Sequence, residues 1–475
     1  MNENRVTIRK EIDNWFELHS NELIRDLEKL IAIRSIRGQA EDGAPYGPGP
    51  RAVLSAAQKM LETRGFAVDE FEDIIITADL GPAPPLLGIL AHLDVVDPGA
   101  GWDTDPFKLA QKDGKLYGRG ATDNKGPAIA AMYAMYCARD ICPEFKHGVQ
   151  ILLGSGEESG CEDILQYLKK VKPPTFVFTP DSDFPVVNVE KGRFVPFFGA
   201  EWDEDGALPR VKSINGGTTI NSVPSNATAT LEGLALTDVE AFCREHSAKT
   251  GAEITAKSDG DTIQVLSRGK AAHAAYPQGG LNALTALVAM LSAMPFAESV
   301  GFEYIRAINR LFPHGDWQGR GLELDMRDEL TGPLTLNLGV LDYTSSSLSA
   351  NFDSRTPAVA DEVDLVGITR DAFSHENLSL KDVTISKCHH TPEDTPFVQS
   401  LLQIYEEYTG NSGKCLSIGG STYVHDIPGG VAFGCEFPGV DCRIHGANEF
   451  IGYAELILSA KMFTQAILDA ANGFM

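Results

Sequence analysis

The sequence predicts a doubly wound α/β domain, with a mixed or parallel sheet, that is interrupted by an inserted α+β domain. Apolar segments of strand length alternate with helical segments over about the first 185 residues, a pattern typical of such sheets. Residues 191–390 instead group several strand segments around few helices, and the alternation resumes near Pro392. We therefore expect residues 1–190 and 391–475 to form one α/β domain around an inserted domain of residues 191–390.

Apolar spacing predicts the elements of the α/β domain. Helices are expected at 9–34, 51–64, 125–139, 163–170, 396–408 and 449–472. Strands are expected at 74–78, 86–90, 149–153, 176–179, 415–418 and 431–434. The Asp113–Gly114 pair predicts a hairpin turn within residues 102–120.

The inserted region has a different composition of elements. Strands are expected at 211–214, 227–234, 262–267, 334–341 and 346–352. Helices are expected at 238–250 and 281–294. A region with this many strands and few helices needs a core of its own, so we expect it to be a second domain.

Charge and composition exclude several classes of partner. The chain of 475 residues has a formal net charge of −26, which argues against nucleic acid or an anionic membrane as partner. Residues 1–10 are polar, and no apolar run approaches the roughly 18 residues of a membrane span. The eight cysteines form no CxxC pair, so free thiols and a cytoplasmic location are expected.

Polar side chains follow the predicted strands where active sites of open α/β sheets form. They are His92, Asp94, Asp123, Glu157, Glu158 and Asp181. One imidazole with several carboxylates and no thiolate suits a pair of divalent ions such as Zn²⁺, Mn²⁺ or Co²⁺. Each residue also has an alternative interpretation: a core histidine for His92, a helix cap for Asp123, a turn for Asp181 and a solvated loop for Glu157–Glu158.

Six segments carry a family resemblance: residues 92–96, 102–107, 116–126, 157–160, 189–192 and 445–450. With these segments the chain resembles the M20 metallopeptidases, most closely the PepV-like dipeptidases of bacteria. The resemblance implies two divalent metal ions per chain, Zn²⁺ in the first place. It implies that His92 and Asp181 bind one metal, that Glu158 and His445 bind the other, and that Asp123 bridges them.

The resemblance also implies catalytic residues around that site. Glu157 is expected to be the general base for a metal-activated water, and Asp94 to orient the imidazole of His92. In the inserted domain, which then acts as a lid, His273 is expected to stabilise the oxyanion. A cis peptide between Asp123 and Asn124 is implied as well. Asn124 itself stands where many relatives have aspartate.

Substrate binding is expected to involve an amide, a guanidinium and a glycine-rich turn. The resemblance implies that Asn221 contacts the substrate and that Arg355 grips its carboxylate. The segment of Gly419, Gly420, Ser421 and Thr422 is expected to offer backbone N–H groups to the same carboxylate.

These features predict a dinuclear metallo-dipeptidase that hydrolyses dipeptides or short peptides with a free carboxyl terminus, with domain closure excluding water. A monomer is expected, with a homodimer as the alternative. The alternative activity is that of an M20 deacylase acting on N-acyl amino acids, of the desuccinylase or deacetylase type. A catalytically silent binding protein on the same scaffold is the remaining alternative, and retention of Glu157 beside all five candidate ligands argues against it.

Overall fold

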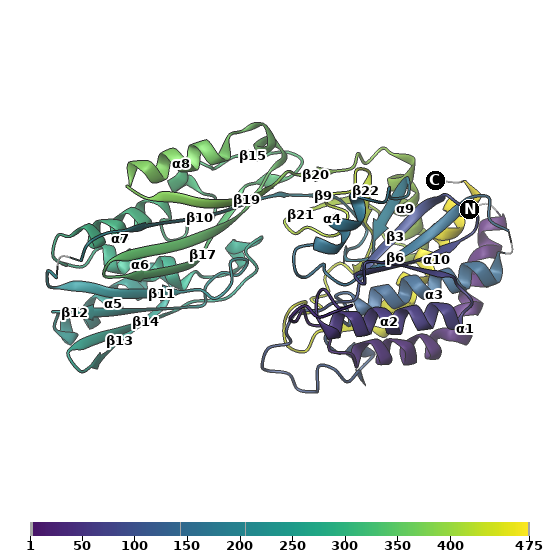
Figure 1. Cartoon of the computed structure of the whole chain (residues 1–475), viewed down its shortest axis with the longest axis horizontal. Coiled ribbons are helices and arrows are strands. Elements are labelled where there is room, and N and C mark those ends of the chain that lie inside the picture. The colour runs from purple at the N-terminus through teal and green to yellow at the C-terminus, as the bar shows by residue number, and fades with distance from the viewer. Residues whose placement is uncertain (1–2, 143, 205, 474–475) are drawn as a thin grey trace. The chain divides into compact units, whose positions relative to one another are not determined.

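The computed structural model describes residues 3–142, 144–204 and 206–473, and these fall into two compact units (Figure 1). Unit 1 comprises Met1–Val189, His389–Ser417 and Ser421–Met475. Unit 2 comprises Glu190–Cys388 together with Ile418–Gly420. Residues 190–388 of unit 2 are therefore inserted between two parts of unit 1, and residues 418–420 also belong to unit 2.

Unit 1 is built on a nine-stranded mixed sheet, which confirms the predicted fold class. Its strands are β1 (Val68–Phe71), β2 (Ile75–Leu80), β3 (Pro85–His92), β6 (Gly148–Gly154), β7 (Phe176–Thr179), β9 (Val186–Glu190), β20 (His389–His390), β21 (Cys415–Ile418) and β22 (Gly430–Ala432). The strand order is β1-β2-β6-β3-β7-β22-β9-β20, with β21 paired to β9. The central strands β6, β3, β7 and β22 are parallel, whereas β1 and β2 are antiparallel.

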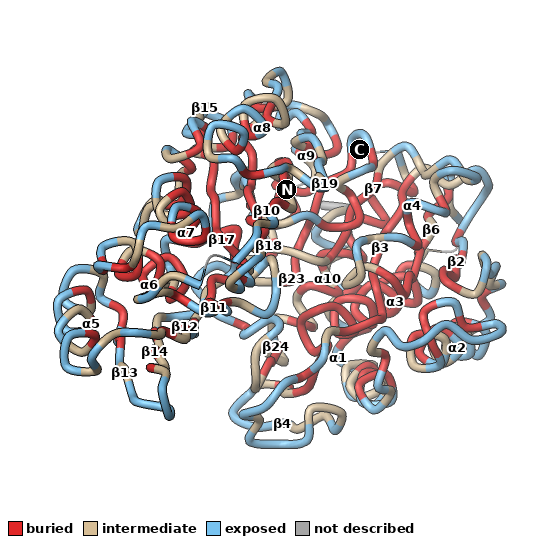
Figure 2. Tube along the Cα trace, turned by 60° about the vertical axis from the view of Figure 1, so that its left-hand side comes forward, coloured by how far each residue is buried: buried red, intermediate tan, exposed pale blue. Residues whose placement is uncertain are grey.

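Helices cover both faces of this sheet. They are α1 (Glu3–Ile31), α2 (Pro48–Thr63), α3 (Lys125–Ile141), α4 (Glu162–Leu168), α9 (Pro396–Thr409) and α10 (Tyr453–Asn472). Ile89 and Ile151 point into a large core shared with α1, α3 and α10, whereas Leu90 and Leu152 point to a smaller core shared with α4. Figure 2 shows α3 and α10 as buried along most of their length. Both faces are thus apolar, as expected for a central parallel sheet.

The last helix begins later than the sequence predicts. Residues Phe450–Gly452 form strand β24, which pairs with β5 (Lys115–Tyr117) next to β4 (Ala110–Lys112). The hairpin predicted around Asp113–Gly114 is therefore present, but it gains a third strand from the far end of the chain. Glu449 lies before this strand and is not helical, because its backbone and side chain bind the segment that follows Tyr117.

Unit 2 contains an eight-stranded sheet of order β13-β14-β12-β11-β17-β18-β10-β19. The strands are β10 (Gly192–Glu201), β11 (Arg210–Gly216), β12 (Asn226–Glu232), β13 (Glu253–Asp259), β14 (Thr262–Arg268), β17 (Thr335–Thr344), β18 (Ser347–Thr356) and β19 (Ser379–Ser386). The helices are α5 (Leu236–Thr250), α6 (Ala283–Ser292), α7 (Val300–Leu311) and α8 (Leu365–His375), and they share one core with the sheet. This is the α+β character that the composition predicts.

The sequence interpretation missed the edge strands β13 and β19 of this sheet, and it also missed the largely buried strand β10. Strands β13 and β19 are mostly exposed, so they carry little of the apolar alternation that identifies a strand. Helices α7 and α8 were missed as well, although Phe302, Ile305 and Ile308 of α7 have helical spacing and are buried. The remaining elements are the short strands β8 (Ser182–Asp183), β15 (Arg327–Asp328), β16 (Gly332–Pro333) and β23 (Cys435–Glu436), and the 3₁₀ turns η1 (Pro277–Gly279), η2 (Arg320–Leu322) and η3 (Ala358–Glu362).

The sequence predicts free thiols and no membrane-spanning helix. All eight cysteines are free thiols, four of them buried. Within residues 3–142, 144–204 and 206–473, no helix combines the length and apolar character that a membrane span needs.

Candidate active site

Five side chains in unit 1 form two groups of metal-ligand type that share one carboxylate. His92, Asp123 and Asp181 form the first group, and Asp123, Glu158 and His445 form the second. Within each group the potential ligand atoms lie within 4.8 Å of one another. The five residues that the sequence singled out as metal ligands are therefore adjacent in the fold.

The parallel strands explain why these residues meet. His92 is the last residue of β3, Glu158 follows the end of β6, and Asp181 follows the end of β7. Because β3, β6 and β7 are parallel neighbours, their carboxyl ends share one edge of the sheet. Asp123 is added by the segment before α3, and the Asp123–Asn124 peptide is cis. His445 comes from a loop in which its own backbone is left-handed, with φ of 60°.

Asp123 lies between the two imidazoles. Its Oδ1 is 3.0 Å from His92 Nε2, and its Oδ2 is 2.9 Å from His445 Nε2. His92 Nε2 is also 3.3 Å from Asp181 Oδ2, and His445 Nε2 is 3.1 Å from Glu158 Oε2. Each oxygen of Asp123 thus faces a different group, which is the disposition of a bridging ligand.

Asp94 contacts both His92 and the neighbouring turn. The Nδ1 atom of His92 lies 3.1 Å from the Asp94 carbonyl and 3.4 Å from its carboxylate. The same carboxylate accepts hydrogen bonds from the backbone N–H groups of Glu157, at 3.3 Å, and Glu158, at 3.1 Å. Asp94 therefore fixes the ring orientation of His92 and the position of the Glu157–Glu158 pair.

The electrostatics of the site favour cations. Burial, with the charges of neighbouring carboxylates, raises the pKa of Glu157 well above its ordinary value and that of Glu158 to about 7. Burial also raises the pKa of Asp123, but hydrogen bonds from His445 and His92 outweigh that effect and lower it overall. Burial lowers the pKa of His445, yet Asp123 and Glu158 raise it to about 11. A cation placed among these carboxylates would therefore be stabilised by their negative charge.

The donor set fits two divalent metal ions. It consists of imidazole nitrogens and carboxylate oxygens, which suit Zn²⁺, Mn²⁺ and Co²⁺. The Oε1 atom of Glu158 is buried and accepts no hydrogen bond from any described residue. An orphaned carboxylate oxygen in a buried site is expected to have a ligand outside the protein.

A second buried carboxylate holds the segment that carries Asp123. Glu449 is fully buried and accepts hydrogen bonds from the N–H groups of Gly120, Thr122 and Asp123 at 3.1, 2.9 and 3.1 Å. It also pairs with Arg119 at 2.6 Å. Since Glu449 is close in sequence to His445, it connects the loops that carry two of the five ligands.

Asn124 supports Asp181 rather than weakening the site. Its Nδ2 atom donates a hydrogen bond to Asp181 Oδ1 at 2.6 Å. The other carboxylate oxygen of Asp181, Oδ2, faces His92. An amide at position 124 therefore orients Asp181 without adding another negative charge to the site.

In unit 2 the structure brings the segments of Asn221 and His273 together. Ser222 and His273 form an isolated β-bridge, and Ala274 N–H donates to the Asn221 carbonyl at 2.9 Å. Ala275 N–H donates to His273 Nδ1 at 3.2 Å. In a neutral imidazole this hydrogen bond places the ring proton on Nε2. Both Asn221 and His273 are exposed.

Arg355 is buried within unit 2, where its guanidinium is held by two partners. Its Nε and Nη2 atoms donate to the carboxylate of Asp353 at 2.8 and 3.1 Å, and its Nη1 donates to the Gly419 carbonyl at 2.9 Å. Arg193 also contacts Asp353, at 3.2 Å. These bonds use three of the five guanidinium donors and leave one N–H on each terminal nitrogen, a geometry suited to a carboxylate.

The glycine-rich segment is only partly available as an anion-binding turn. The N–H group of Gly419 donates to Tyr276 Oη at 3.3 Å, and its carbonyl faces Arg355. Gly420 is half-buried, Ser421 is exposed and Thr422 is buried. Gly419 therefore connects Arg355 to the Tyr276 segment, which the sequence pattern did not predict.

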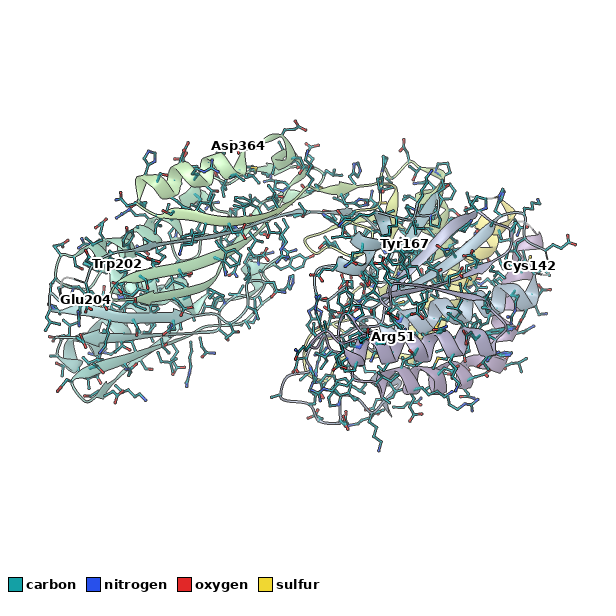
Figure 3. All side chains as sticks on the ribbon, viewed as in Figure 1. Arg51, Cys142, Tyr167, Trp202, Glu204 and Asp364 are labelled. Atoms are coloured by element: carbon teal, nitrogen blue, oxygen red, sulfur yellow. The ribbon has the colours of Figure 1, made fainter. Side chains whose placement is uncertain are left out.

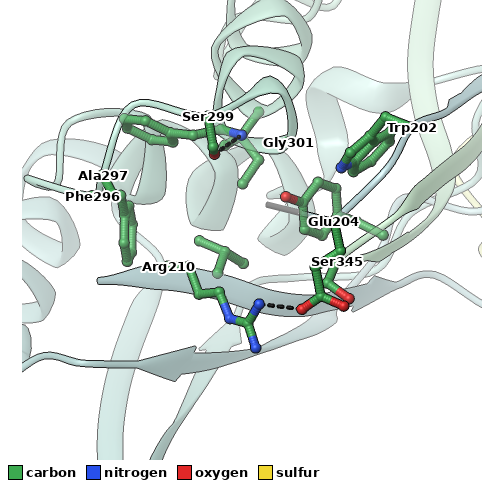
Figure 4. A pocket seen from close by; sticks show the side chains of 12 residues that line it. Trp202, Glu204, Arg210, Phe296, Ala297, Ser299, Gly301 and Ser345 are labelled. Carbon is green, nitrogen blue, oxygen red and sulfur yellow. Dashed lines mark hydrogen bonds and ion pairs between the residues drawn. The ribbon is translucent and has the colours of Figure 1, made fainter. Parts of the chain in front are cut away.

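The cavity drawn in Figure 4 lies elsewhere, within unit 2. It is lined by Trp202, Arg210, Phe296 and Tyr343 among others, with Arg210 paired to Glu204. Its volume of about 20 Å³ leaves room for about one water molecule. This cavity is too small for a peptide, and none of the described residues that line it belongs to a group of metal-ligand type.

The residues that sequence reasoning missed are the ones that hold the site in place. The sequence pattern predicts Asp163 only as the start of a helix, yet its side chain accepts hydrogen bonds from the turn before Glu157. Asp353 precedes Arg355 by two residues on β18 and was not assigned a role. A buried acidic residue close in sequence to a predicted site residue was the available signal in both cases.

Comparisons with known proteins agree with this geometry. The sequence matches the family described as Peptidase family M20/M25/M40 over residues 88–469. It is 32% identical to “Putative dipeptidase YtjP” of Bacillus subtilis over 459 residues, covering 95% of this chain and 97% of that protein. It is 30% identical to the Beta-Ala-Xaa dipeptidase of Lactobacillus delbrueckii subsp. lactis, with 95% and 97% covered.

Solved structures share the fold. Human carnosine dipeptidase 1 is similar with a TM-score of 0.57 at 16% identity, covering 98% of this chain and 99% of that chain. The dipeptidase Dug1p of Saccharomyces cerevisiae gives a TM-score of 0.58 at 13% identity, with 99% of each chain covered. The family match over residues 88–469, with the relative at 32% identity, shows that the chain is a member of the M20 family of metallopeptidases.

Proposed function

We propose that this protein is a dinuclear metal-dependent dipeptidase that cleaves the peptide bond of dipeptides or short peptides with a free carboxyl terminus. The observation that carries the proposal is the pair of three-donor groups joined through Asp123, with Glu157 next to them in sequence. The relatives named as dipeptidases match 95% of this chain. His92, Asp123 and Asp181 would hold one ion, and Asp123, Glu158 and His445 the other.

Two divalent ions at these positions would lower the pKa of a water molecule and polarise the scissile carbonyl. Glu157 is the proposed general base, because a buried carboxylate with a raised pKa accepts a proton readily and can pass it to the leaving amine. His273 is proposed to donate from Nε2 to the oxyanion. Asn221 is proposed to contact the substrate backbone.

Arg355 is proposed to bind the terminal carboxylate of the substrate. Asp353 neutralises one edge of its guanidinium and the Gly419 carbonyl fixes another. The two donors that remain match the two oxygens of a carboxylate in number. Gly420, Ser421 and Thr422 are proposed to add N–H groups to the same site.

A feature of unit 1 favours a substrate with a free amine over an N-acyl amino acid. Asp183 and Glu436 are register partners on the parallel strands β8 and β23. Neither side chain has a cationic partner among the described residues, and burial with the charge of Asp183 raises the pKa of Glu436 to about 8. A substrate ammonium group would relieve this repulsion, whereas a succinyl carboxylate would increase it.

The test is hydrolysis of Ala-Ala and of N-acetylalanine by chelator-stripped protein to which Zn²⁺, Mn²⁺ or Co²⁺ is added back. We expect cleavage of Ala-Ala that depends on the metal, and no cleavage of N-acetylalanine. Cleavage of N-acetylalanine alone would identify a deacylase. Absence of both activities in protein that binds two equivalents of metal would contradict an enzymatic function.

A further inference from the structure

The turn that carries Glu157 and Glu158 is held by two buried carboxylates. Asp163 accepts hydrogen bonds from the N–H groups of Ser155 and Gly156, each at 2.8 Å. Asp94 accepts from the next two N–H groups, those of Glu157 and Glu158. Four successive backbone amides, from residue 155 to residue 158, thus point to carboxylates.

Asp163 has no cation to balance its charge. It is fully buried, and no lysine or arginine pairs with it in the described part of the chain. A buried carboxylate without an ionic partner lowers the stability of the fold, because its charge is desolvated. Stability alone therefore does not explain the presence of Asp163. Hydrogen-bond donors from neutral groups take the place of a cation around Asp163.

Tyr423 supplies a side-chain donor to Asp163, in addition to the backbone N–H groups of Ser155, Gly156 and Ile164. Its hydroxyl donates to Asp163 Oδ2 at 2.5 Å, and its ring is fully buried. The same ring lies edge-to-face against the imidazole of His92, with ring centroids 6.2 Å apart. Tyr423 therefore contacts the Asp163 side of the turn and one of the proposed metal ligands.

The turn fits closely against these two residues. A Cβ atom at Gly154 would lie 2.1 Å from Tyr423 Oη and 2.5 Å from Asp163 Oδ2. A Cβ atom at Gly156 would lie 3.1 Å from Asp163 Cγ and 2.8 Å from the ring of Tyr46. Glycine is required at both positions because the backbone approaches these side chains so closely.

From this geometry we propose that Asp163 and Tyr423 are positioning residues that fix the Glu157–Glu158 turn, so that the general base and the adjacent metal ligand point in different directions. Asp94 holds the second half of the turn, and the Asp163–Tyr423 pair holds the first half. The proposal rests on the proposed function for its effect on catalysis. Its structural part, the restraint of the turn, is independent of that function.

Tyr423→Phe is the decisive variant, because it removes one hydroxyl and leaves the ring packing in place. We expect kcat for Ala-Ala to fall about 10- to 100-fold, as for a small displacement of a catalytic group. KM and the content of two metal ions should stay unchanged. Asp163→Asn should lower kcat further. It replaces one of the two acceptor oxygens of Asp163 by an NH₂ group, which cannot accept a hydrogen bond from the N–H and O–H donors around it.

Tyr167→Phe is the matched control. Tyr167, labelled in Figure 3, is buried in the same small core and packs edge-to-face on Phe71. Its hydroxyl makes no described hydrogen bond to the turn. We expect kcat of Tyr167→Phe within about twofold of the parent protein, as for a change remote from the site.

Two further measurements separate this proposal from a general effect on folding and from the proposed function. In a Glu157→Gln background, Tyr423→Phe should cause little additional loss of kcat, because most of its effect on kcat is exerted through the position of Glu157. Amide hydrogen exchange of residues 155–158 should accelerate in Tyr423→Phe, whether or not the protein cleaves Ala-Ala. Unchanged exchange, or a full additional loss in the Glu157→Gln background, would overturn the proposal. Lack of Ala-Ala hydrolysis by the parent protein, with accelerated exchange in the variant, would instead contradict the proposed function alone.

Discussion

The candidate metal site in unit 1 and the candidate substrate-binding residues in unit 2 are held in different ways. In unit 1, His92 and Glu449 are fully buried, and side-chain carboxylates bind the backbone that carries the ligands. In unit 2, Asn221 and His273 are exposed and are joined through backbone hydrogen bonds between two loops. Only Arg355 combines burial with side-chain partners.

This difference follows from what each region has to bind. Carboxylates placed close together repel one another, so a metal site needs a rigid frame that holds them before the cations arrive. Groups that contact a substrate can lie on loops, since substrates enter and leave in every turnover. The two regions should therefore respond differently to substitution: changes in unit 1 alter metal content or base chemistry, and changes in unit 2 leave metal content intact.

The largest effect is expected from Asp123→Asn. Loss of one negative charge from the carboxylate shared by both groups should release metal from both sites and abolish hydrolysis. Metal content measured after desalting should fall well below two equivalents. The control is Asp97→Asn, the same change at an exposed position soon after β3; full metal content in Asp123→Asn would refute the bridging role.

Glu157→Gln should have the next largest effect. Removal of a general base is expected to lower kcat by about 10²- to 10⁴-fold, while both metal ions remain bound. Glu162→Gln, at an exposed position on α4, is the control for loss of charge near the turn. A Glu157→Gln protein with parent-like kcat would exclude this residue as the base.

His273→Ala tests the exposed loops of unit 2. Loss of one oxyanion donor is expected to lower kcat by about 10²- to 10³-fold, with two metal ions still bound. His375→Ala, which changes an exposed histidine of the same unit on α8, should be silent. Loss of metal from His273→Ala would contradict the distinction between the two regions.

The smallest effect is expected from Arg355→Lys. A lysine keeps the charge beside Asp353 but cannot form the forked pair of hydrogen bonds, so KM for Ala-Ala should rise about tenfold, equivalent to about 1.4 kcal/mol. Ala-Ala amide lacks the terminal carboxylate, so the Arg355→Lys variant and the parent protein should cleave it equally well. Arg210→Lys, remote from Asp353 and paired with Glu232, is the control. A loss that is equal for both substrates would show that Arg355 does not bind the carboxylate.

Much of the fold was predictable because it depends on local patterns. The buried strands β3, β6 and β7 were identified from short apolar runs, and α3 from a small apolar segment. The edge strands β13 and β19 were not predicted, because an exposed strand needs no apolar alternation. The start of α10 was misplaced, because residues 450–452 pair with β5 from the other end of the chain.

The sequence by itself determined the fold class, the family resemblance and the set of residues that could bind metal. Apolar periodicity and the placement of polar residues after strands are properties of nearby positions, so they can be recognised without coordinates. His445 was the exception, because only the resemblance linked it to residues more than 250 positions earlier.

The tertiary structure alone decided how those residues are held. Asp163 and Tyr423 meet across 260 positions, Arg119 and Glu449 across 330, and Arg355 finds its Gly419 partner across 64. No local pattern predicts such partners, because a buried backbone N–H is satisfied by whichever side chain the fold brings near it. Long-range hydrogen bonding therefore fixed the geometry of residues whose identity the sequence had already indicated.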